Sequence, residues 1–162
     1  MRLTKLLRSV LGKTGEFSTL GEEIKLIEAY LEIEHARFEE RLQVKINVPK
    51  DLEQIRVPSL ILQPLVENAI KHGISKSKNG GEVTISAKLE TENGEVFLKL
   101  CVFDSGCGET INKLSHGIGL GNIENRLQNY YGDSASLRIE NGETNGTNAS
   151  ICIPSSKFQI PN

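Results

Sequence analysis

The sequence predicts an α+β domain, a two-layer sandwich in which helices cover a mixed, mostly antiparallel sheet. Three observations predict it: helical spacing of apolar residues before residue 40, alternation of apolar and polar residues in about five later segments, and two helical insertions among those segments. At 162 residues the chain can bury about two thirds of the surface that it exposes when unfolded, which fits one domain with a real core.

Charge and cysteine content narrow the classes of function. The chain has 19 basic and 21 acidic residues and a net charge of −2, so we expect no nucleic-acid partner. Cys101, Cys107 and Cys152 are odd in number and lack metal-ligand spacing, which predicts reduced thiols in a reducing compartment. No apolar run approaches the ~20 residues that a helix needs to span a bilayer.

Two helices are predicted at the start of the chain. Residues 3–10 have helical spacing, and the pattern stops at glycines. Thr19 is followed three residues later by Glu22, which is the spacing of a capping box, and a helix of roughly twenty residues extends from there to Phe38. We place an internal boundary after this helix, near Glu40.

The later segments predict strands and one more helix. LQVKINVP, from Leu42, alternates apolar and polar residues and is closed by Pro49, as in a half-buried strand. EVTISAKLE and EVFLKLCVF alternate in the same way and are joined across TENG, which predicts a hairpin. LGNIENRLQNYYG returns to helical spacing, and ASLRIENGETNGTNASICIP gives two more short strands.

Three polar motifs are candidates for a site, although each alone has a purely structural interpretation. In QPLVENAIKHG, Asn68, Lys71 and His72 lie opposite the apolar arc of a helix, which by itself is more typical of a solvated face. In DSGCG, Asp104 ends a strand and could accept a hydrogen bond from an exocyclic amine, but the motif is about as common in plain turns. In GIGLGN, glycines open a helix whose free N–H groups could bind phosphate, or could form only a turn and a cap.

Taken in order, these motifs and the terminal GTNASICIP resemble the nucleotide-binding domain of the GHKL superfamily, which has the Bergerat, or histidine-kinase-like ATPase, fold. More narrowly, TLGEEIKLIEAYLEIEHARFEERL followed by VPSLILQPLVENAIKHGI resembles the LytS-type sensor histidine kinases, and the likeness extends from about Leu3 to Pro154. It implies a remnant of the dimerisation helix and a linker helix in residues 1–40, an ATP-binding catalytic domain in residues 41–154 and a tail in residues 155–162.

The resemblance also implies a role for each matching residue. Asn68 matches the ligand of a Mg²⁺ ion that bridges the phosphates of ATP, and an amide oxygen suits that ion. Lys71 matches a lysine that approaches the phosphates, and Glu67 and His72 flank them. Asp104 matches the aspartate that reads adenine. The other matching positions are Gly106 and Gly108 beside the base, Gly117, Gly119, Leu120 and Asn122 at the phosphate loop and the next helix, and Thr147 behind the adenine.

The chain departs from the family pattern in two ways. Pro64 stands where hydrolytic members carry the glutamate that activates water, so we expect poor hydrolysis and a proline in the first turns of its helix. The motif P-H-F-x-F-N, which carries the phosphoacceptor histidine, is absent; His35 is expected to be an exposed helix residue, and His116 belongs to a short lid, Glu109 to His116. Arg126, four residues after Asn122, could reach the phosphates, but we expect an ion pair on the helix surface instead.

The resemblance therefore implies an ATP-dependent protein histidine kinase, of which this chain is the catalytic part without its own target histidine. It further implies a response regulator receiver domain as a partner of the full-length kinase, a homodimer, and a cytoplasmic location as part of a membrane-bound sensor. Two alternatives stay open: a nucleotide-dependent binding module, and an anti-sigma-type serine kinase of the same fold.

Overall fold

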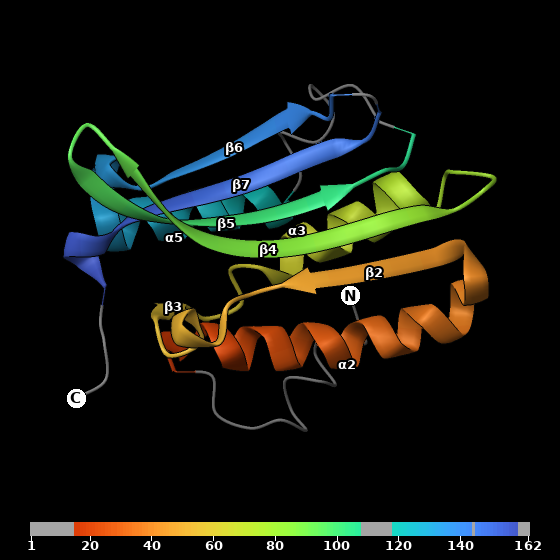
Figure 1. Cartoon of the computed structure of the whole chain (residues 1–162), viewed down its shortest axis with the longest axis horizontal. Helices are drawn as coiled ribbons and strands as arrows, with labels where there is room; N and C mark the ends of the chain where they lie inside the picture. The colour runs from red at the N-terminus through yellow and green to blue at the C-terminus, as the bar shows by residue number, and fades with distance from the viewer. Residues whose placement is uncertain (1–14, 108–117, 144, 159–162) are drawn as a thin grey trace.

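The computed structural model describes residues 15–107, 118–143 and 145–158. A five-stranded sheet with the strand order β2-β4-β5-β7-β6 forms one layer (Figure 1). β2 and β4 are parallel and every other pair is antiparallel, so the mixed, mostly antiparallel sheet is confirmed. In this order the strands are Leu42–Asn47, Gly81–Glu92, Glu95–Asp104, Thr147–Pro154 and Ser136–Asn141.

The hairpin expected across TENG is formed by β4 and β5. Its ends are the paired residues Glu92 and Glu95, and the two residues between them, Asn93 and Gly94, have φ angles of 51° and 81°. Positive φ at both central residues is the geometry of a type I′ turn, whose twist matches that of the strands. The Asn-Gly pair therefore fixes the register of the two longest strands.

Among the residues that the structure describes, the second layer consists of the α-helices α2 (Leu20–Phe38), α3 (Gln63–Asn68) and α5 (Ile118–Tyr131). The expected capping box is present, because the Thr19 hydroxyl accepts from the backbone N–H of Glu22 and the Glu22 carboxylate accepts from that of Thr19. Pro64 lies in the first turn of α3, as predicted, where a missing N–H costs no helical hydrogen bond. Short 3₁₀ turns are formed by Glu39–Arg41, Lys50–Leu52, Gly132–Ser134 and Ser155–Lys157.

A second, two-stranded sheet was not predicted. β1 (Phe17–Thr19) pairs antiparallel with β3 (Arg56–Pro58) at the N-terminal end of α2. Each strand has three residues, too few for alternation to be recognised.

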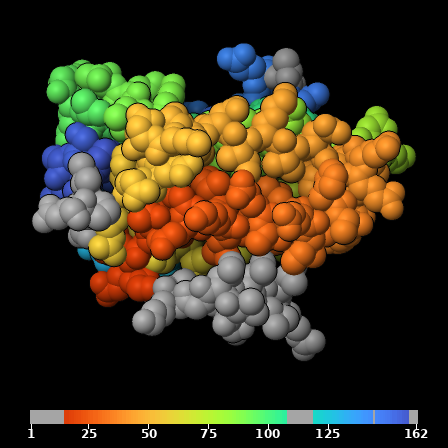
Figure 2. Space-filling view, turned by 60° about the horizontal axis from the view of Figure 1, so that its bottom comes forward, coloured from red at the N-terminus to blue at the C-terminus, as the bar shows by residue number. Residues whose placement is uncertain are grey.

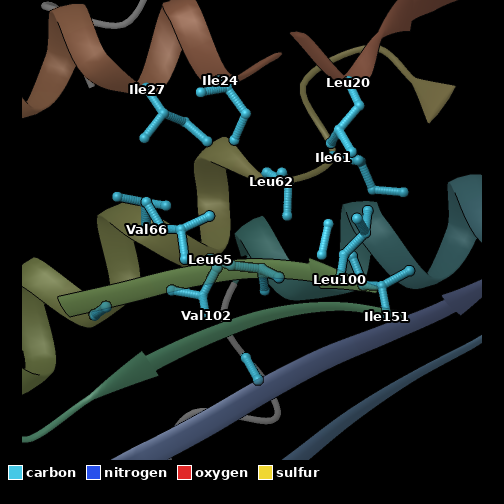
Figure 3. Packing of buried hydrophobic residues seen from close by; sticks show 14 of the residues in the cluster. Leu20, Ile24, Ile27, Ile61, Leu62, Leu65, Val66, Leu100, Val102 and Ile151 are labelled. Atoms are coloured by element: carbon cyan, nitrogen blue, oxygen red, sulfur yellow. The ribbon is translucent and has the colours of Figure 1, made fainter. Parts of the chain in front are cut away.

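The helices and one face of the sheet share a single hydrophobic core. Ile24 and Ile27 of α2 point toward Leu62 and Val66, while Leu65 on the other side of α3 lies over the sheet (Figure 3). α2 and β2 lie side by side on one face of the molecule, in red and orange in Figure 2. The core extends from α2 into the sheet without a break at Glu40. The domain boundary expected near Glu40 therefore gains no support from the packing and stays a prediction.

Several remaining expectations concern the ends of the chain and exposed positions. The helix over residues 3–10 and the lid lie outside the described residues. Phe158, in the expected tail, packs against the core, and His35 is exposed as predicted. The three cysteines are free. In the described part of the chain, no helix is long and apolar enough to cross a membrane.

Candidate functional site

A pocket lies between the helical layer and the sheet, with about 390 Å³ of space including its open mouth. Its walls are mostly apolar, with a few polar side chains among them. The lining residues are Leu65, Asn68, Ala69, His72, Val102, Asp104, Leu120, Ile139, Thr147 and Ala149.

Three neighbouring strands supply the floor of the pocket. Asp104 of β5 is paired with Thr147 of β7, and Val102 with Ala149, which in turn is paired with Ile139 of β6. Since side chains two residues apart on a strand share a face, this register brings all five side chains to the same face of the sheet. Predicted site residues 43 positions apart thus become direct neighbours.

The helix above the floor supplies the other wall. After α3 the chain continues as a π-helical segment, η3 (Ala69–Ile74), in which the Ser75 N–H bonds to the Ile70 carbonyl at 2.8 Å. A π-helix has more residues per turn than an α-helix, so His72 returns to the side of Asn68 while Lys71 turns away. Asn68 and His72 line the pocket, and Lys71 is exposed.

Asp104 is a buried acid at the floor of this pocket. Its exposed fraction is 4%, and its Oδ1 accepts the N–H of Gly106 at 3.0 Å. Burial raises the pKa of this carboxyl from its ordinary value near 3.8 to about 6, although the Gly106 N–H acts in the opposite direction. At neutral pH the group is therefore mostly a carboxylate, which can accept further hydrogen bonds from a ligand.

Glycines pack closely around Asp104. A Cβ atom on Gly73 would overlap the Asp104 carboxylate, and one on Gly146, whose φ is +85°, would overlap the Asp104 carbonyl. A Cβ on Gly106 would overlap the backbone of Gly73. Gly106 thus lets the loop after β5 approach the helix; its expected contact with a base stays a prediction.

Glu67 lies away from the pocket, toward α2. It accepts a hydrogen bond from the Gln63 amide at 3.2 Å, and it lies close enough to Tyr30 to influence it. Burial raises the pKa of Tyr30, and the negative charges of Glu34 and Glu67 raise it further. The role of Glu67 beside phosphates therefore stays a prediction without support from its position.

The remaining predicted residues lie near the start of α5 or beyond the described ranges. Leu120 is buried in the pocket wall, Gly119 approaches Pro64, and Asn122 is exposed. Gly108 and Gly117 lie outside the described residues. Arg126, for which a surface ion pair was expected, instead donates from its guanidinium to the carbonyl of Ser59 in the turn before α3.

The apolar walls and two glycines were missed by the sequence reasoning. The strand alternation that marked Asp104 and Thr147 also implied Val102 and Ala149, two residues away on the same face. Gly73 and Gly146 lie at the ends of the quoted motifs QPLVENAIKHG and GTNASICIP, but no local pattern showed that Asp104 would pack against them.

The polar side chains of the pocket can hold a cation only if a bound ligand supplies some of the atoms that coordinate the cation. No group of three or more His, Cys, Asp or Glu that could hold a metal ion occurs among the residues that the structure describes. Asn68 offers one amide oxygen at the pocket wall. Mg²⁺ commonly takes one or two protein ligands and completes its shell with water and phosphate oxygens, so a single Asn68 fits that ion.

The arrangement can bind a flat, partly apolar ring that carries a hydrogen-bond donor. Leu65, Val102 and Ala149 offer apolar surface, while Asp104 offers a buried acceptor. Because burying an unpaired carboxylate is costly, a ligand amine that binds Asp104 would be strongly preferred over a ring without one.

Comparison with known proteins gives matches over most of the chain. Residues 53–157 match the family of histidine kinase-, DNA gyrase B-, and HSP90-like ATPases, and residues 1–42 match a family described as histidine kinase. The sensor histidine kinase BtsS of Escherichia coli K12 is 37% identical over 94% of this chain and 26% of its own length. The sensor protein LytS of Staphylococcus haemolyticus is 33% identical over 96% of this chain and 28% of its own. The chain thus spans about a quarter of these relatives.

Solved structures share the fold at low sequence identity. The histidine kinase domain of the blue-light activated kinase from Erythrobacter litoralis superimposes with a TM-score of 0.64 at 19% identity, covering 96% of this chain and 71% of that one. A nucleotide-free catalytic domain of the histidine kinase ThkA gives 0.63 at 16% identity, covering 86% of this chain and 98% of the other. The expected α+β fold is confirmed by these neighbours.

Proposed function

Because this chain belongs to the histidine kinase-, DNA gyrase B- and HSP90-like ATPase family, we propose that it is the ATP-binding catalytic part of a two-component sensor histidine kinase. It holds ATP for phosphoryl transfer to a histidine on an upstream helix. One observation carries the proposal: the buried Asp104 carboxylate lies at the floor of a pocket whose other wall carries Asn68 and His72. Phosphoryl transfer from ATP needs a site that binds the base at one end and the phosphates at the other.

The sheet side of the pocket is assigned to adenine. Asp104 accepts a hydrogen bond from the exocyclic amine of the base, and the buried Thr147 lies beside it on the next strand. Leu65 and Ala149 cover the faces of the ring and exclude water from it. Gly106 and Gly108 are assigned to close approach to the base, as the sequence resemblance implies.

The helix side is assigned to the phosphates. Asn68 would hold Mg²⁺ through its amide oxygen, and His72 would bind phosphate oxygens. Lys71 is exposed outside the pocket lining, so its assignment to the phosphates rests on the sequence resemblance alone. Bound Mg²⁺ neutralises charge that develops on the phosphates during transfer. The phosphate loop and the helix that follows it are assigned to Gly117, Gly119, Leu120 and Asn122. Glu67 is assigned to a place beside the phosphates on the sequence resemblance alone.

Pro64 makes this a site for transfer to a protein rather than to water. It lies in the first turn of α3, near Gly119, and its side chain can neither accept nor donate a proton. A general base within reach of an attacking water contributes about 10²–10⁴-fold to a rate, and this position supplies none. The purified chain should therefore turn ATP over slowly.

The full-length protein is proposed to work as a homodimer that phosphorylates a response regulator receiver domain. It would act in the cytoplasm, as the inner part of a membrane-bound sensor. Residues 1–40 would connect the catalytic domain, residues 41–154, to the part that carries the target histidine, and residues 155–162 would be a tail. The role as a sensor draws on the names of the relatives, a sensor histidine kinase and a sensor protein. The other assignments rest on the sequence resemblance.

The proposal is tested by isothermal titration of the chain with a non-hydrolysable ATP analogue, with and without Mg²⁺. We expect binding that Mg²⁺ strengthens and that Asp104→Asn weakens. A phosphotransfer assay with the full-length kinase and a receiver domain then tests the reaction itself. Binding without any transfer would favour a nucleotide-dependent binding module, and the absence of binding would refute the proposed site.

A further inference from the structure

A second buried acid, Glu23 of α2, lies away from the pocket. Its exposed fraction is 3%, and it accepts four hydrogen bonds: from the Ser18 hydroxyl at 2.7 Å and from the backbone N–H groups of Leu60, Ile61 and Leu62 at 2.7, 3.0 and 3.4 Å. Burial raises the pKa of this carboxyl, while its donors act in the opposite direction. Backbone groups of a distant turn thus surround the acid.

That turn leads directly into the helix of the candidate site. Residues 59–62 precede α3, which starts at Gln63 and carries Asn68. Leu60 has a φ angle of +63°, in the left-handed region that costs energy for a residue with a side chain. Such a conformation persists only where its surroundings hold it, and here three successive N–H groups converge on one carboxylate.

The same turn is also held from the side of α5. The guanidinium of Arg126 donates to the Ser59 carbonyl, and the Ser59 hydroxyl donates to the carbonyl of Gly15 at 2.7 Å. α5 carries Leu120, which lines the pocket. The turn therefore joins α2, α3 and α5, which are the α-helices of the described residues.

Packing extends this junction toward the sheet. α2 lies above α3, and α3 above β5 and β7, with Ile24 and Ile27 pointing at Leu62 and Val66 (Figure 3). The height and tilt of α3 over Asp104 thus depend on how the turn before it is fixed to α2.

We propose that Glu23 is a positioning residue for the nucleotide site. Through the turn at residues 59–62 it fixes the start of α3, and with it the placement of Asn68 and His72 relative to Asp104 and α5. This inference rests on the proposed ATP site and adds a route by which a displacement of α2 reaches that site. A purely structural role would lower stability without changing which part of the nucleotide is bound.

Glu23→Gln is the variant that separates these roles. The glutamine keeps the shape of the side chain, but its NH₂ group must face at least one backbone N–H that now points at a carboxylate oxygen. We expect the competent position of α3 to be populated less, which lowers the apparent affinity in proportion. Losing one hydrogen bond to a charged acceptor corresponds to about a tenfold weaker binding of the Mg²⁺–ATP analogue.

The control variant is Glu22→Ala, which removes the capping-box contact at the same end of α2 but does not touch the turn. Each chain is titrated with the Mg²⁺–ATP analogue and with Mg²⁺-free ADP, at a temperature where circular dichroism shows it folded. Glu23→Gln should bind the Mg²⁺–ATP analogue about tenfold more weakly and Mg²⁺-free ADP less than about threefold more weakly. Glu22→Ala should change neither affinity. Arg126→Met, which releases the turn from α5, should shift affinity in the same direction and serves if Glu23→Gln does not fold.

The results of these titrations distinguish the proposed ATP site from the proposed positioning role of Glu23. If the unaltered chain binds no nucleotide, the proposed function fails and the inference with it. If the unaltered chain binds and Glu23→Gln or Arg126→Met binds the Mg²⁺–ATP analogue equally well, only the inference fails. Equal losses for both ligands would also overturn it, because they would reflect a general loss of structure.

Discussion

Replacing Asp104 with asparagine should weaken nucleotide binding and, at neutral pH, raise the free energy of unfolding. Residue Asp104 is 4% exposed, and its carboxylate has one hydrogen-bond donor among the described residues, the N–H of Gly106. A charge held in such a place destabilises the folded chain, which is a cost that a structural residue would not need to carry.

The size of the expected change in the free energy of unfolding follows from the raised pKa of Asp104. A rise from about 3.8 in the unfolded chain to about 6 in the folded one means that ionised Asp104 costs up to about 3 kcal/mol above pH 6. Asparagine removes that cost, but it weakens the hydrogen bond from Gly106 and buries an amide NH₂, which together offset about 1–2 kcal/mol. The net gain at pH 7 should be about 1–2 kcal/mol.

The pH dependence has a definite sign. Between pH 4 and 6 the folded chain holds the Asp104 proton more tightly than the unfolded chain, so the wild type gains stability as pH falls through this window. The advantage of Asp104→Asn should therefore be full at pH 7 to 8, vanish near pH 5 and turn into a disadvantage below about pH 4, where only the offset of about 1–2 kcal/mol remains.

Urea denaturation at pH 8, 7, 5 and 4 measures these differences, with Asp51→Asn at an exposed acid as the control. Isothermal titration at pH 7.5 should show about ten- to hundredfold weaker binding of the ATP analogue, the value of one lost charge-assisted hydrogen bond. A variant that is less stable than wild type at pH 8, or a stability difference that is the same from pH 8 to pH 4, would refute the reasoning.

The other predictions concern the helix wall, the glycines and the cap. Gly73→Ala should lower the free energy of unfolding by about 1–3 kcal/mol in urea denaturation, because the new Cβ overlaps Asp104, while Gly121→Ala, which meets no atom within 4 Å, should not. Asn68→Ala should remove the strengthening of ATP-analogue binding by Mg²⁺ in titration and leave Mg²⁺-free ADP binding within about twofold; a surviving Mg²⁺ effect would contradict the assignment. Thr19→Ala should cost about 1 kcal/mol in thermal or urea unfolding without changing nucleotide affinity.

The elements that the sequence predicted well are those whose signal is local. The capping box at Thr19 and the Asn93-Gly94 turn each need only the residues that form them, and both are present in the structure. The polar motifs near Asn68 and Asp104 also indicated the right elements, since a helix wall and a strand end do meet at one pocket.

The features that were not predicted from the sequence depend on contacts between residues that are far apart in the chain. The β1–β3 pair has three residues in each strand and exists because α2 and the turn at residues 59–62 bring its members together. The π-helical segment from Ala69 changes the phase of the helix, which is why Lys71 and His72 have different surroundings. The sequence reasoning did not single out Glu23, and only the fold reveals its three backbone donors.

Two of the buried acids, Glu23 and Asp104, differ in a way that separates structure from binding. Burial raises the pKa of both carboxyls, yet Glu23 receives four hydrogen bonds and Asp104 receives one from the described residues. A buried polar group is normally paired, so a fully paired acid such as Glu23 is explained by the fold that it holds together. Asp104 keeps acceptor capacity that the fold does not use, inside a pocket and among glycines that fit closely around it. The missing partner of Asp104 is therefore best supplied by a ligand that brings its own donor, as adenine does.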